Sequence, residues 1–251
     1  MIVREDFQSI AVIRMAHGKV SAIDLELCAA LIAEFEQVAA SPATALVLTG
    51  TGSTFSAGVD LFRVLQGRSE YLKRFLPAMG TLFRTLLTFP KPAIAAVNGH
   101  AMAGGCILAA ACDHRVMAGG TARIGIPELA VGVPFPPLPF EIVRARVNPS
   151  AFHQLVYTGG VLQPREAVEV GLIDEIAEPA QLIDRAREVA ARLARIPSNT
   201  FALTKRTFTA PLLARVDAAS SIHADVLEAW RSEAVLDRMR AYLDETVGKR
   251  R

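Results

Sequence analysis

The sequence predicts an α/β fold, with strands and helices alternating over the first two-thirds of the chain and helices alone in the last third. Short apolar runs rich in β-branched residues recur between segments whose apolar residues have helical spacing. With 251 residues, of which 51% are hydrophobic, the chain can bury a large core. Beyond about residue 141 the strand-like runs stop, and prolines separate one helical segment from the next.

The first elements follow in chain order. Residues 10–13 are enriched in β-branched side chains and predict a strand. Residues 24–40 carry apolar side chains at helical spacing, and residues 45–49 form a short apolar run typical of a buried strand. A second helix is expected over residues 70–89, where Pro77 would kink or divide it.

The later elements repeat this alternation before the helical third begins. Residues 93–97 predict a strand, residues 104–111 a short helix of small residues, and residues 115–118 a further strand. The last helix is expected over residues 220–249, and this helical tail has too little mass to form a core alone. It should therefore pack on the α/β part or on a neighbouring subunit.

Charge and cysteine usage exclude several classes of protein. The chain has 27 basic and 25 acidic side chains, a net charge of +2, and its basic residues are scattered, so no nucleic-acid partner is expected. Cys28, Cys106 and Cys112 form no CxxC pair, and the five histidines show no metal-ligand spacing. We therefore expect neither disulfides nor a metal site, and a reducing, cytoplasmic location.

No segment predicts a membrane span or a targeting signal. The N-terminus lacks the apolar run of a signal peptide. The longest charge-free stretch, residues 92–112, is divided by Asn98 and by the pair Gly104 and Gly105 into pieces too short to cross a bilayer.

Familiar cofactor and nucleophile motifs are absent. The segment Gly50-Thr-Gly-Ser-Thr-Phe follows a strand, but Phe55 replaces the third glycine of a dinucleotide-binding fingerprint. Neither Ser53 nor Ser56 lies in a GxSxG elbow, and there is no P-loop. Hydride transfer and serine hydrolysis are therefore not expected.

Two glycine-containing turns, residues 55–61 and 98–106, each follow a strand and precede a helix. Glycine lets the backbone approach a ligand closely, and a helix N-terminus offers unpaired N–H donors. If the amides of Val59 and Gly104 converge, they form an oxyanion hole for an enolate-like transition state. Two ordinary strand-to-helix turns are the alternative.

These turns, followed by Cys112-Asp-His-Arg-Val and then Ile124-Gly-Ile-Pro-Glu-Leu, resemble the enoyl-CoA hydratase/isomerase (crotonase) superfamily. The similarity covers nearly the whole chain, including Tyr157-Thr-Gly-Gly. The resemblance implies a crotonase-like spiral of ββα repeats in residues 1–195 and a helical C-terminal oligomerisation region in residues 196–251. It also implies a homotrimer or dimer of trimers acting on an acyl-CoA thioester; coenzyme A is part of the substrate, so no separate cofactor is expected.

The resemblance assigns roles to individual residues. Val59 and Gly104 donate the oxyanion hydrogen bonds, and Glu128 is the catalytic carboxylate. Lys19 and Lys205 are candidates for binding the phosphates of coenzyme A. The stiff segment that begins at Phe135 is a candidate for one wall of the acyl pocket. The residues expected to contact the substrate are Val20, Ala22, Ala57, Gly58, His100, Ile107 and Phe135.

One departure from the hydratase pattern decides the predicted reaction. Hydratases of this superfamily use two glutamates. Here Ile107 occupies the position of the first glutamate, so only the second, Glu128, remains. One carboxylate beside an oxyanion hole suffices to move a proton from C2 to C4 of a 3-enoyl thioester. The segment 103–118 also resembles the monofunctional Δ3-Δ2-enoyl-CoA isomerases, so we expect that reaction.

Three alternatives stay open. A hydratase would need another acidic or polar group in the pocket; Glu141 is treated as a charge on a helix face unless it lies near Glu128. A catalytically weak binding protein would have a misaligned hole or an occluded acyl site. The third alternative is that Glu128 is a solvated loop residue.

Asp60 and Asp113 are expected to have structural roles, capping a helix or forming a pair near the turns.

Overall fold

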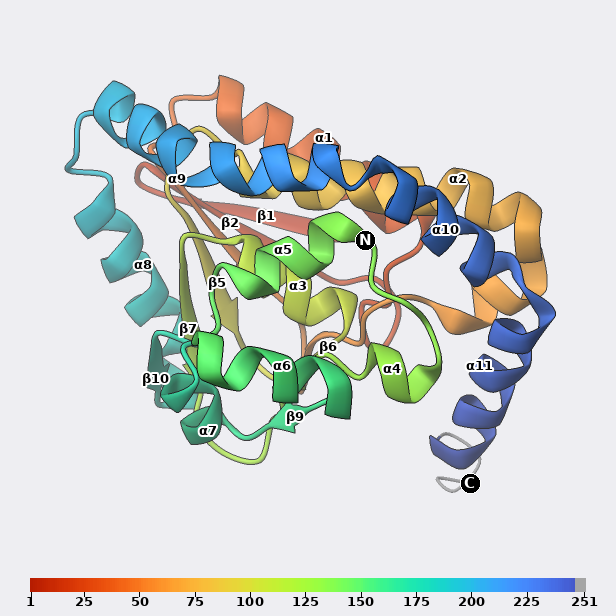
Figure 1. Ribbon diagram of the computed structural model, residues 1–251. Helices are drawn as coiled ribbons and strands as arrows, with labels where there is room; N and C mark the ends of the chain where they lie inside the picture. The colour runs from red at the N-terminus through yellow and green to blue at the C-terminus, as the bar shows by residue number, and fades with distance from the viewer. Residues whose placement is uncertain (247–251) are drawn as a thin grey trace.

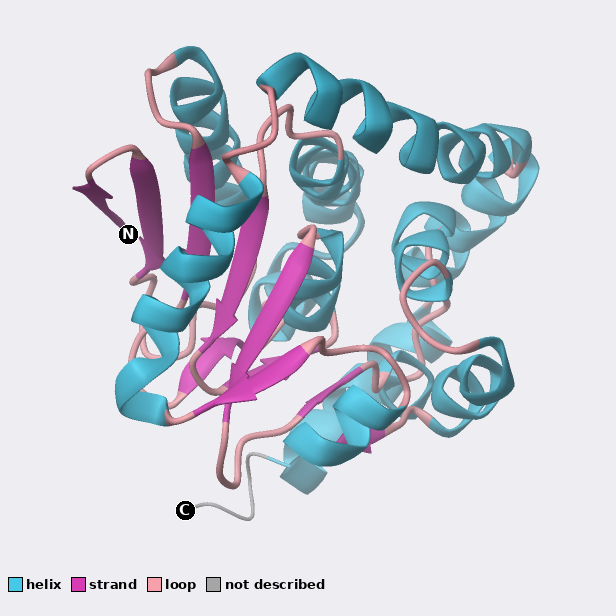
Figure 2. Cartoon of the chain, turned by 90° about the vertical axis from the view of Figure 1, so that its left-hand side faces the viewer, coloured by secondary structure: helices cyan, strands magenta, loops and turns pink. Residues whose placement is uncertain are grey.

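Residues 1–246, which the computed structural model describes, form a framework of sheets covered by helices (Figures 1 and 2). Among these residues the larger sheet has six strands, and neighbouring strands are parallel except for an antiparallel pair at one edge. In spatial order they are β1 (Ile2–Phe7), β2 (Ile10–Met15), β3 (Ala45–Thr49), β5 (Ala93–Val97), β7 (His114–Ala118) and β10 (Glu175–Ala177).

Both faces of this sheet are covered, which explains why its central strands are continuous apolar runs. Val12, Val47 and Ile94 pack on helix α8 (Leu182–Leu193), which crosses one face in Figure 2. The alternate side chains of the same strands belong to the main core on the other face. Three helices cover that face: α1 (Leu25–Ala40), α2 (Leu61–Leu87) and α3 (Gly104–Ala111).

A smaller sheet receives the strand that follows each of three strands of the larger one. Its members are β4 (Thr54–Ser56), β6 (His100–Met102), β8 (Ile124–Gly125) and β9 (Val161–Leu162), and the short helix α4 (Glu128–Val131) follows β8. The chain therefore repeats a ββα unit as β3-β4-α2, β5-β6-α3 and β7-β8-α4. This confirms the predicted α/β fold with a spiral of ββα repeats.

The register of the smaller sheet brings successive repeats side by side. Thr54 lies opposite His100, and Ala101 lies opposite Ile124, in parallel pairs. Because parallel strands end at the same edge, the turns after β4 and β6 become neighbours. The two glycine-containing turns meet for this reason.

Helix α2 begins nine residues before the predicted start. Asp60 caps it, accepting a hydrogen bond from the Arg63 amide at 3.0 Å. Arg68 then leaves helical geometry, with φ 47° and ψ −138°, and Pro77 lies within the helix without ending it. The break at Arg68 divides α2 into two halves, and buried apolar residues lie in both of them. The sequence pattern revealed only the second half.

The last third is helical as predicted, but its final helix is divided. Instead of one helix over residues 220–249 there are two, separated at Ser232; residues 247–249 lie outside the described part. Figure 1 shows the last described helix turning down beside α4. The helices of this region are α5 (Pro137–Arg144), α6 (Pro149–Thr158), α7 (Pro164–Glu169), α9 (Ser198–Ala218), α10 (Ser220–Arg231) and α11 (Glu233–Thr246), with a 3₁₀ turn at Pro179–Gln181.

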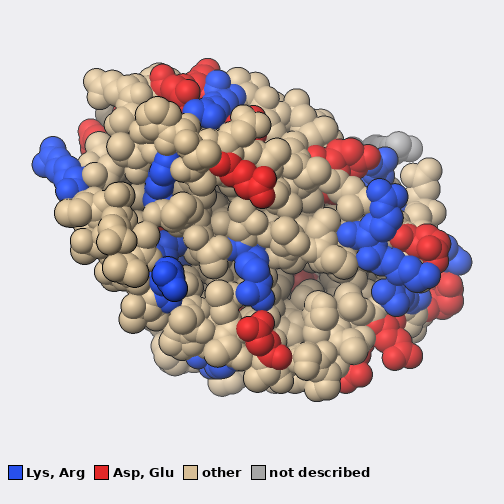
Figure 3. All heavy atoms as spheres, turned by 90° about the horizontal axis from the view of Figure 1, so that it is seen from above, with Lys and Arg blue, Asp and Glu red and all other residues tan. Residues whose placement is uncertain are grey.

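The surface and helices add two general facts. On the face seen in Figure 3, basic and acidic side chains are interspersed rather than gathered by sign. Within residues 1–246, no helix combines the length and apolarity needed to cross a membrane.

The division of the chain into a spiral core that ends at residue 195 and an oligomerisation region that begins at residue 196 stays a prediction.

Candidate active site

Val59 and Gly104 both line one cavity. On either side of Val59 the backbone is fixed, because the Ile23 amide donates to the Gly58 carbonyl at 2.7 Å and the Asp60 amide donates to the Ile23 carbonyl at 3.0 Å. Within residues 1–246, no backbone or side-chain acceptor takes a hydrogen bond from either the Val59 or the Gly104 amide. Two free donors therefore adjoin the same space.

Gly58 allows the two turns to approach so closely. Its φ is +81°, and a Cβ atom there would lie 2.5 Å from the Met102 carbonyl oxygen and 3.0 Å from the Gly104 amide nitrogen. Any other residue would be strained in this conformation and would press against the neighbouring turn. The glycine is required by contact as well as by torsion.

Ala103, at the N-cap of α3, is held in a strained conformation with φ 49° and ψ −120°. Its amide donates to the Gly125 carbonyl at 2.8 Å, and its carbonyl accepts from the Ile107 amide at 3.0 Å. Such strain persists only where surrounding contacts enforce it. Here it sets the start of α3, so that the Gly104 amide lies at the positive end of the helix dipole.

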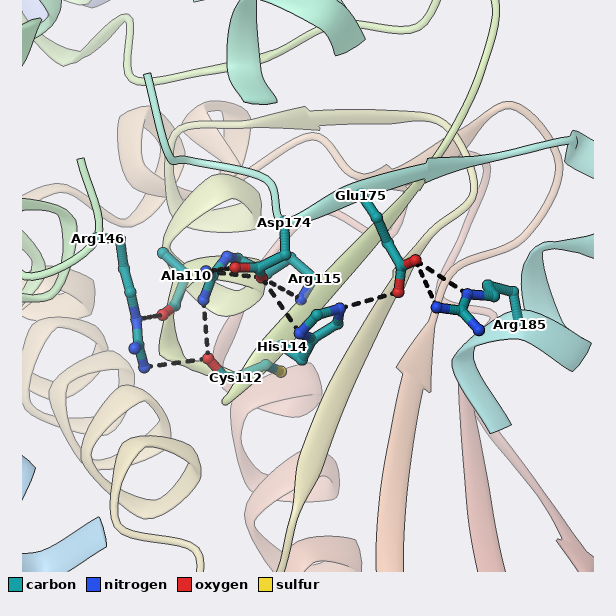
Figure 4. A network of polar contacts seen from close by, with 8 residues as sticks. All are labelled: Ala110, Cys112, His114, Arg115, Arg146, Asp174, Glu175 and Arg185. Carbon is teal, nitrogen blue, oxygen red and sulfur yellow. Dashed lines mark hydrogen bonds and ion pairs between the residues drawn. The ribbon is translucent and has the colours of Figure 1, made fainter. Parts of the chain in front are cut away.

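The opposite end of α3 is fixed by arginines (Figure 4). Arg146 donates to the carbonyls of Ala110, at 2.9 Å, and Cys112, at 3.1 Å. Arg115 also donates to the Cys112 carbonyl, at 3.2 Å, and pairs with Asp174 at 2.7 Å. Cations at a helix C-terminus satisfy its free carbonyls and offset the negative end of its dipole. The helix that presents Gly104 is therefore anchored at both ends.

Glu128 begins α4 and lies in the same cavity with 8% of its surface exposed. Burial away from water raises the pKa of its carboxyl group to about 8. Its Oε2 atom is buried and has no hydrogen-bond partner within residues 1–246. A buried carboxylate oxygen without a partner is costly to the fold, which favours a functional role over a solvated loop position.

The cavity has a volume of about 90 Å³ and mostly apolar walls. Ile107 on α3 and Phe135 before α5 line it. Trp230 on α10 and Tyr242 on α11 close it from the C-terminal helices, and the Trp230 indole N–H donates to the Pro134 carbonyl at 3.0 Å. The C-terminal region therefore completes the cavity within one chain.

Tyr242 is a polar group of the cavity that the sequence analysis missed. Its pKa is raised, first by burial and then by the neighbouring Glu128 carboxylate. The only sequence signal was its place among the apolar residues of the tail. That pattern predicted packing, but it gave no indication of which surface would be covered.

The predicted residues divide into two groups. Gly58, Val20 and Ala22 do not line the cavity. Gly58 forms the close contact described above. The Val20 carbonyl accepts a hydrogen bond from the Ala57 amide at 3.0 Å, and Ala22 follows in the same segment. His100 lies in β6, where Nδ1 accepts from the Arg123 amide at 3.2 Å, and it does not line the cavity. The residues that do line it are Ala57, Val59, Gly104, Ile107, Glu128 and Phe135.

Two other candidate side chains have structural partners instead. Glu141 pairs with Arg144 at 2.6 Å and Arg215 at 2.7 Å and does not line the cavity, so it supplies no second carboxylate. Lys205 is buried and pairs with Asp113 at 2.8 Å, which leaves it unsuited to hold a phosphate. The cap formed by Asp60 and the pair formed by Asp113 agree with their predicted structural roles.

Comparison with known proteins places the chain among acyl-CoA enzymes. The family model for enoyl-CoA hydratase/isomerase matches residues 5–246. The crotonyl-CoA hydratase of Syntrophomonas wolfei is 32% identical over 203 residues, which cover 80% of this chain and 77% of that protein. The mitochondrial enoyl-CoA delta isomerase 1 of Rattus norvegicus is 29% identical over 211 residues, 82% of this chain and 72% of that one.

A solved structure shows the same fold. The human mitochondrial delta3-delta2-enoyl-CoA isomerase superposes with a TM-score of 0.94 and covers 99% of this chain and 98% of its own, at 22% identity.

Replacing the buried carboxyl group should change how stability depends on pH. With a native pKa of about 8 against an ordinary 4.5, the native state binds the proton more tightly than the unfolded state, so stability falls as pH rises between these values. Glu128→Gln removes this penalty. In urea unfolding, the free energy of unfolding of the variant, relative to that of the wild type, should rise by about 4 kcal/mol between pH 5 and pH 8.

The exposed Glu36 on α1 supplies the matched control, Glu36→Gln, because a solvated carboxylate carries no burial penalty. A constant difference between wild type and Glu128→Gln across this pH range would contradict the assigned burial.

Proposed function

Because the chain belongs to the enoyl-CoA hydratase/isomerase family, we propose that it is a Δ3-Δ2-enoyl-CoA isomerase that uses Glu128 as its proton shuttle. The observation that carries this proposal is a cavity with one carboxylate. Glu128 lines this cavity together with Val59 and Gly104, and Ile107, 1% exposed, fills the place where a hydratase keeps its other glutamate.

The proposed reaction needs no group from outside the cavity. The thioester carbonyl oxygen accepts hydrogen bonds from the Val59 and Gly104 amides, which stabilise the negative charge that develops there. The Glu128 carboxylate takes the proton from C2, and the electron pair of that C–H bond spreads into a dienolate. The protonated carboxyl group then returns the proton to C4, and the double bond moves from C3–C4 to C2–C3.

The raised pKa of Glu128 suits both half-reactions. A carboxylate whose conjugate acid has a pKa of about 8 is a stronger base than an exposed glutamate. The protonated form is also populated near neutral pH, so it can hand the proton back. Apolar walls such as Ile107 limit the access of water that would otherwise add to the double bond.

Binding of the coenzyme A portion is proposed for the segment beside the hole. Backbone groups near Val20 and Ala22 would contact the adenosine side, together with Ala57. The hydrogen bond between the Ala57 amide and the Val20 carbonyl supports this assignment, because it joins these backbone segments next to the cavity.

Hydration is the second candidate, and Tyr242 favours it. A hydratase needs another polar group in the pocket, and the Tyr242 phenol lies on the cavity with Glu128. The crotonyl-CoA hydratase relative belongs to the same family. A catalytically weak binding protein is less well supported, because its acyl site should be occluded, whereas the two free amides here adjoin an open cavity.

An assay with separate 3-enoyl-CoA and 2-enoyl-CoA substrates distinguishes the two reactions. We expect formation of the conjugated thioester from the first and little hydration of the second. Glu128→Gln should reduce isomerisation by about 10³-fold, since general acid–base catalysis contributes on this scale. Glu141→Gln is the control and should retain activity; rapid hydration without isomerisation would reject the isomerase.

The contact at Gly58 offers an independent test of the oxyanion hole. Gly58→Ala places a methyl group against the Met102 carbonyl and should displace one donor, lowering kcat/KM by about 10²-fold. Gly52→Ala is the matched control, because Gly52 also has a positive φ but no atom lies within 4 Å of its Cβ position. Equal activity of the two variants would mean that the close approach does not serve catalysis.

A homotrimer or dimer of trimers is proposed for the assembly. Large apolar side chains that remain exposed on one chain support this, because their burial between subunits removes apolar surface from water. Sedimentation equilibrium should give a mass of three or six chains; a monomer at micromolar concentration would reject it. These side chains include Leu129, Tyr157, Leu203, Phe208 and Ile222.

A further inference from the structure

Of the residues that line the cavity in the described part of the chain, Glu128 and Tyr242 are the two whose side chains ionise. They come from different helices, Glu128 from the start of α4 and Tyr242 from α11. The buried Oε2 atom of Glu128 lacks a hydrogen-bond partner among residues 1–246, although a charged carboxylate can accept several. The Tyr242 phenol carries an O–H donor, so the cavity holds an acceptor and a donor that complement each other.

Helix α11 is fixed against α4 one helical turn away from Tyr242 (Figure 1). The Arg238 guanidinium donates to the Ala130 carbonyl of α4 at 2.9 Å. A Cβ atom at Gly132, where α4 ends, would overlap the Arg238 side chain, so the two segments are in direct contact. Residues four positions apart share a face of a helix. Tyr242 therefore lies on the face of α11 that packs on the helix of Glu128.

The surroundings of Tyr242 keep its proton in place while Glu128 titrates. Burial raises the pKa of the Tyr242 phenol above its ordinary value of 10, and the Glu128 carboxylate raises this pKa further. The positive charge of Arg238 lowers it to a smaller extent. Because the pKa of Glu128 is about 8, there is a pH range in which the carboxylate is charged and the phenol is still a donor.

Other titratable groups around Glu128 do not offer such a donor. The pKa of the Cys106 thiol on α3 is raised by burial first and then by the charge of Glu128, but Cys106 does not line the cavity. Of residues 1–246, no ionisable side chain from α2, α5, α6 or α10 lines it either. Tyr242 is therefore the side chain best placed to respond to the charge on Glu128.

We propose that Tyr242 is a positioning residue for the carboxylate: its phenol donates a hydrogen bond to the charged form of Glu128 and holds that form ready to accept a proton. This inference rests on the proposed function, because it takes Glu128 to be the proton shuttle. It gives Tyr242 a role other than that of a second acid, since the phenol keeps its own proton throughout. A hydrogen bond to the charged form also favours that form, so more of the protein carries the base near neutral pH.

Titration of Glu128 in the substrate-free protein tests this role. The carboxyl C=O stretch in infrared spectra, assigned by its loss in Glu128→Gln, measures the protonated fraction at each pH. Tyr242→Phe removes the hydroxyl group but keeps the aromatic ring and its packing. Since the charged carboxylate then loses its donor, Glu128 should bind its proton about tenfold more tightly, and its titration should move to higher pH.

Tyr71→Phe is the matched control. Tyr71 on α2 is also partly buried, but it does not line the cavity, so loss of its hydroxyl group should leave the titration of Glu128 unchanged. Equal titrations of Glu128 in Tyr242→Phe and Tyr71→Phe would overturn the inference, and so would weaker proton binding in Tyr242→Phe.

The pH dependence of kcat/KM for 3-enoyl-CoA gives a second readout. Its acidic limb reports proton binding by Glu128 in the free enzyme and should move to higher pH in Tyr242→Phe by the same factor. A rate that falls equally at every pH would assign Tyr242 a merely structural role and overturn the inference. A shifted infrared titration in a protein that does not isomerise would instead support the hydrogen bond and reject the proposed reaction.

Discussion

The contact between the turn at Gly58 and the start of α3 is the constraint on which the site depends. Val59 and Gly104 line one cavity where these backbones come close, and a Cβ at Gly58 would lie 2.5 Å from the Met102 carbonyl. The parallel register of β4 and β6 brings the turns together. The strained Ala103 and the arginines at the far end of α3 then hold the helix in place. The sheet topology thus determines the geometry of the proposed oxyanion hole.

Burial gives the carboxyl group of Glu128 its chemistry. The apolar walls that raise its pKa are contributed by distant parts of the chain, including Ile107 on α3 and Trp230 on α10. A side chain that is unfavourable for the fold therefore lies where the proposed reaction needs a base and an acid in turn. The stability cost and the proposed activity have the same physical cause.

Local patterns were sufficient to predict much of the fold, and the resemblance of short motifs to a known family indicated the centre of the candidate site. Val59, Gly104 and Glu128 lie in short motifs whose turns and helix starts are determined by nearby residues, and the structure places all three on one cavity. Tyr242 and the pairing of Lys205 depend on which surfaces meet in three dimensions. Helical periodicity identifies an apolar face but not its partner, so these contacts were not predicted.

The walls of the cavity extend in sequence from Ala57 to Tyr242. During synthesis, which proceeds from the N-terminus, the ββα repeats can form while α10 and α11 are still being made. The paired amides and Glu128 would then exist in a site open to water, without Trp230 and Tyr242. A nascent chain therefore acquires the parts of its candidate active site well before it acquires the buried environment that raises the pKa of Glu128.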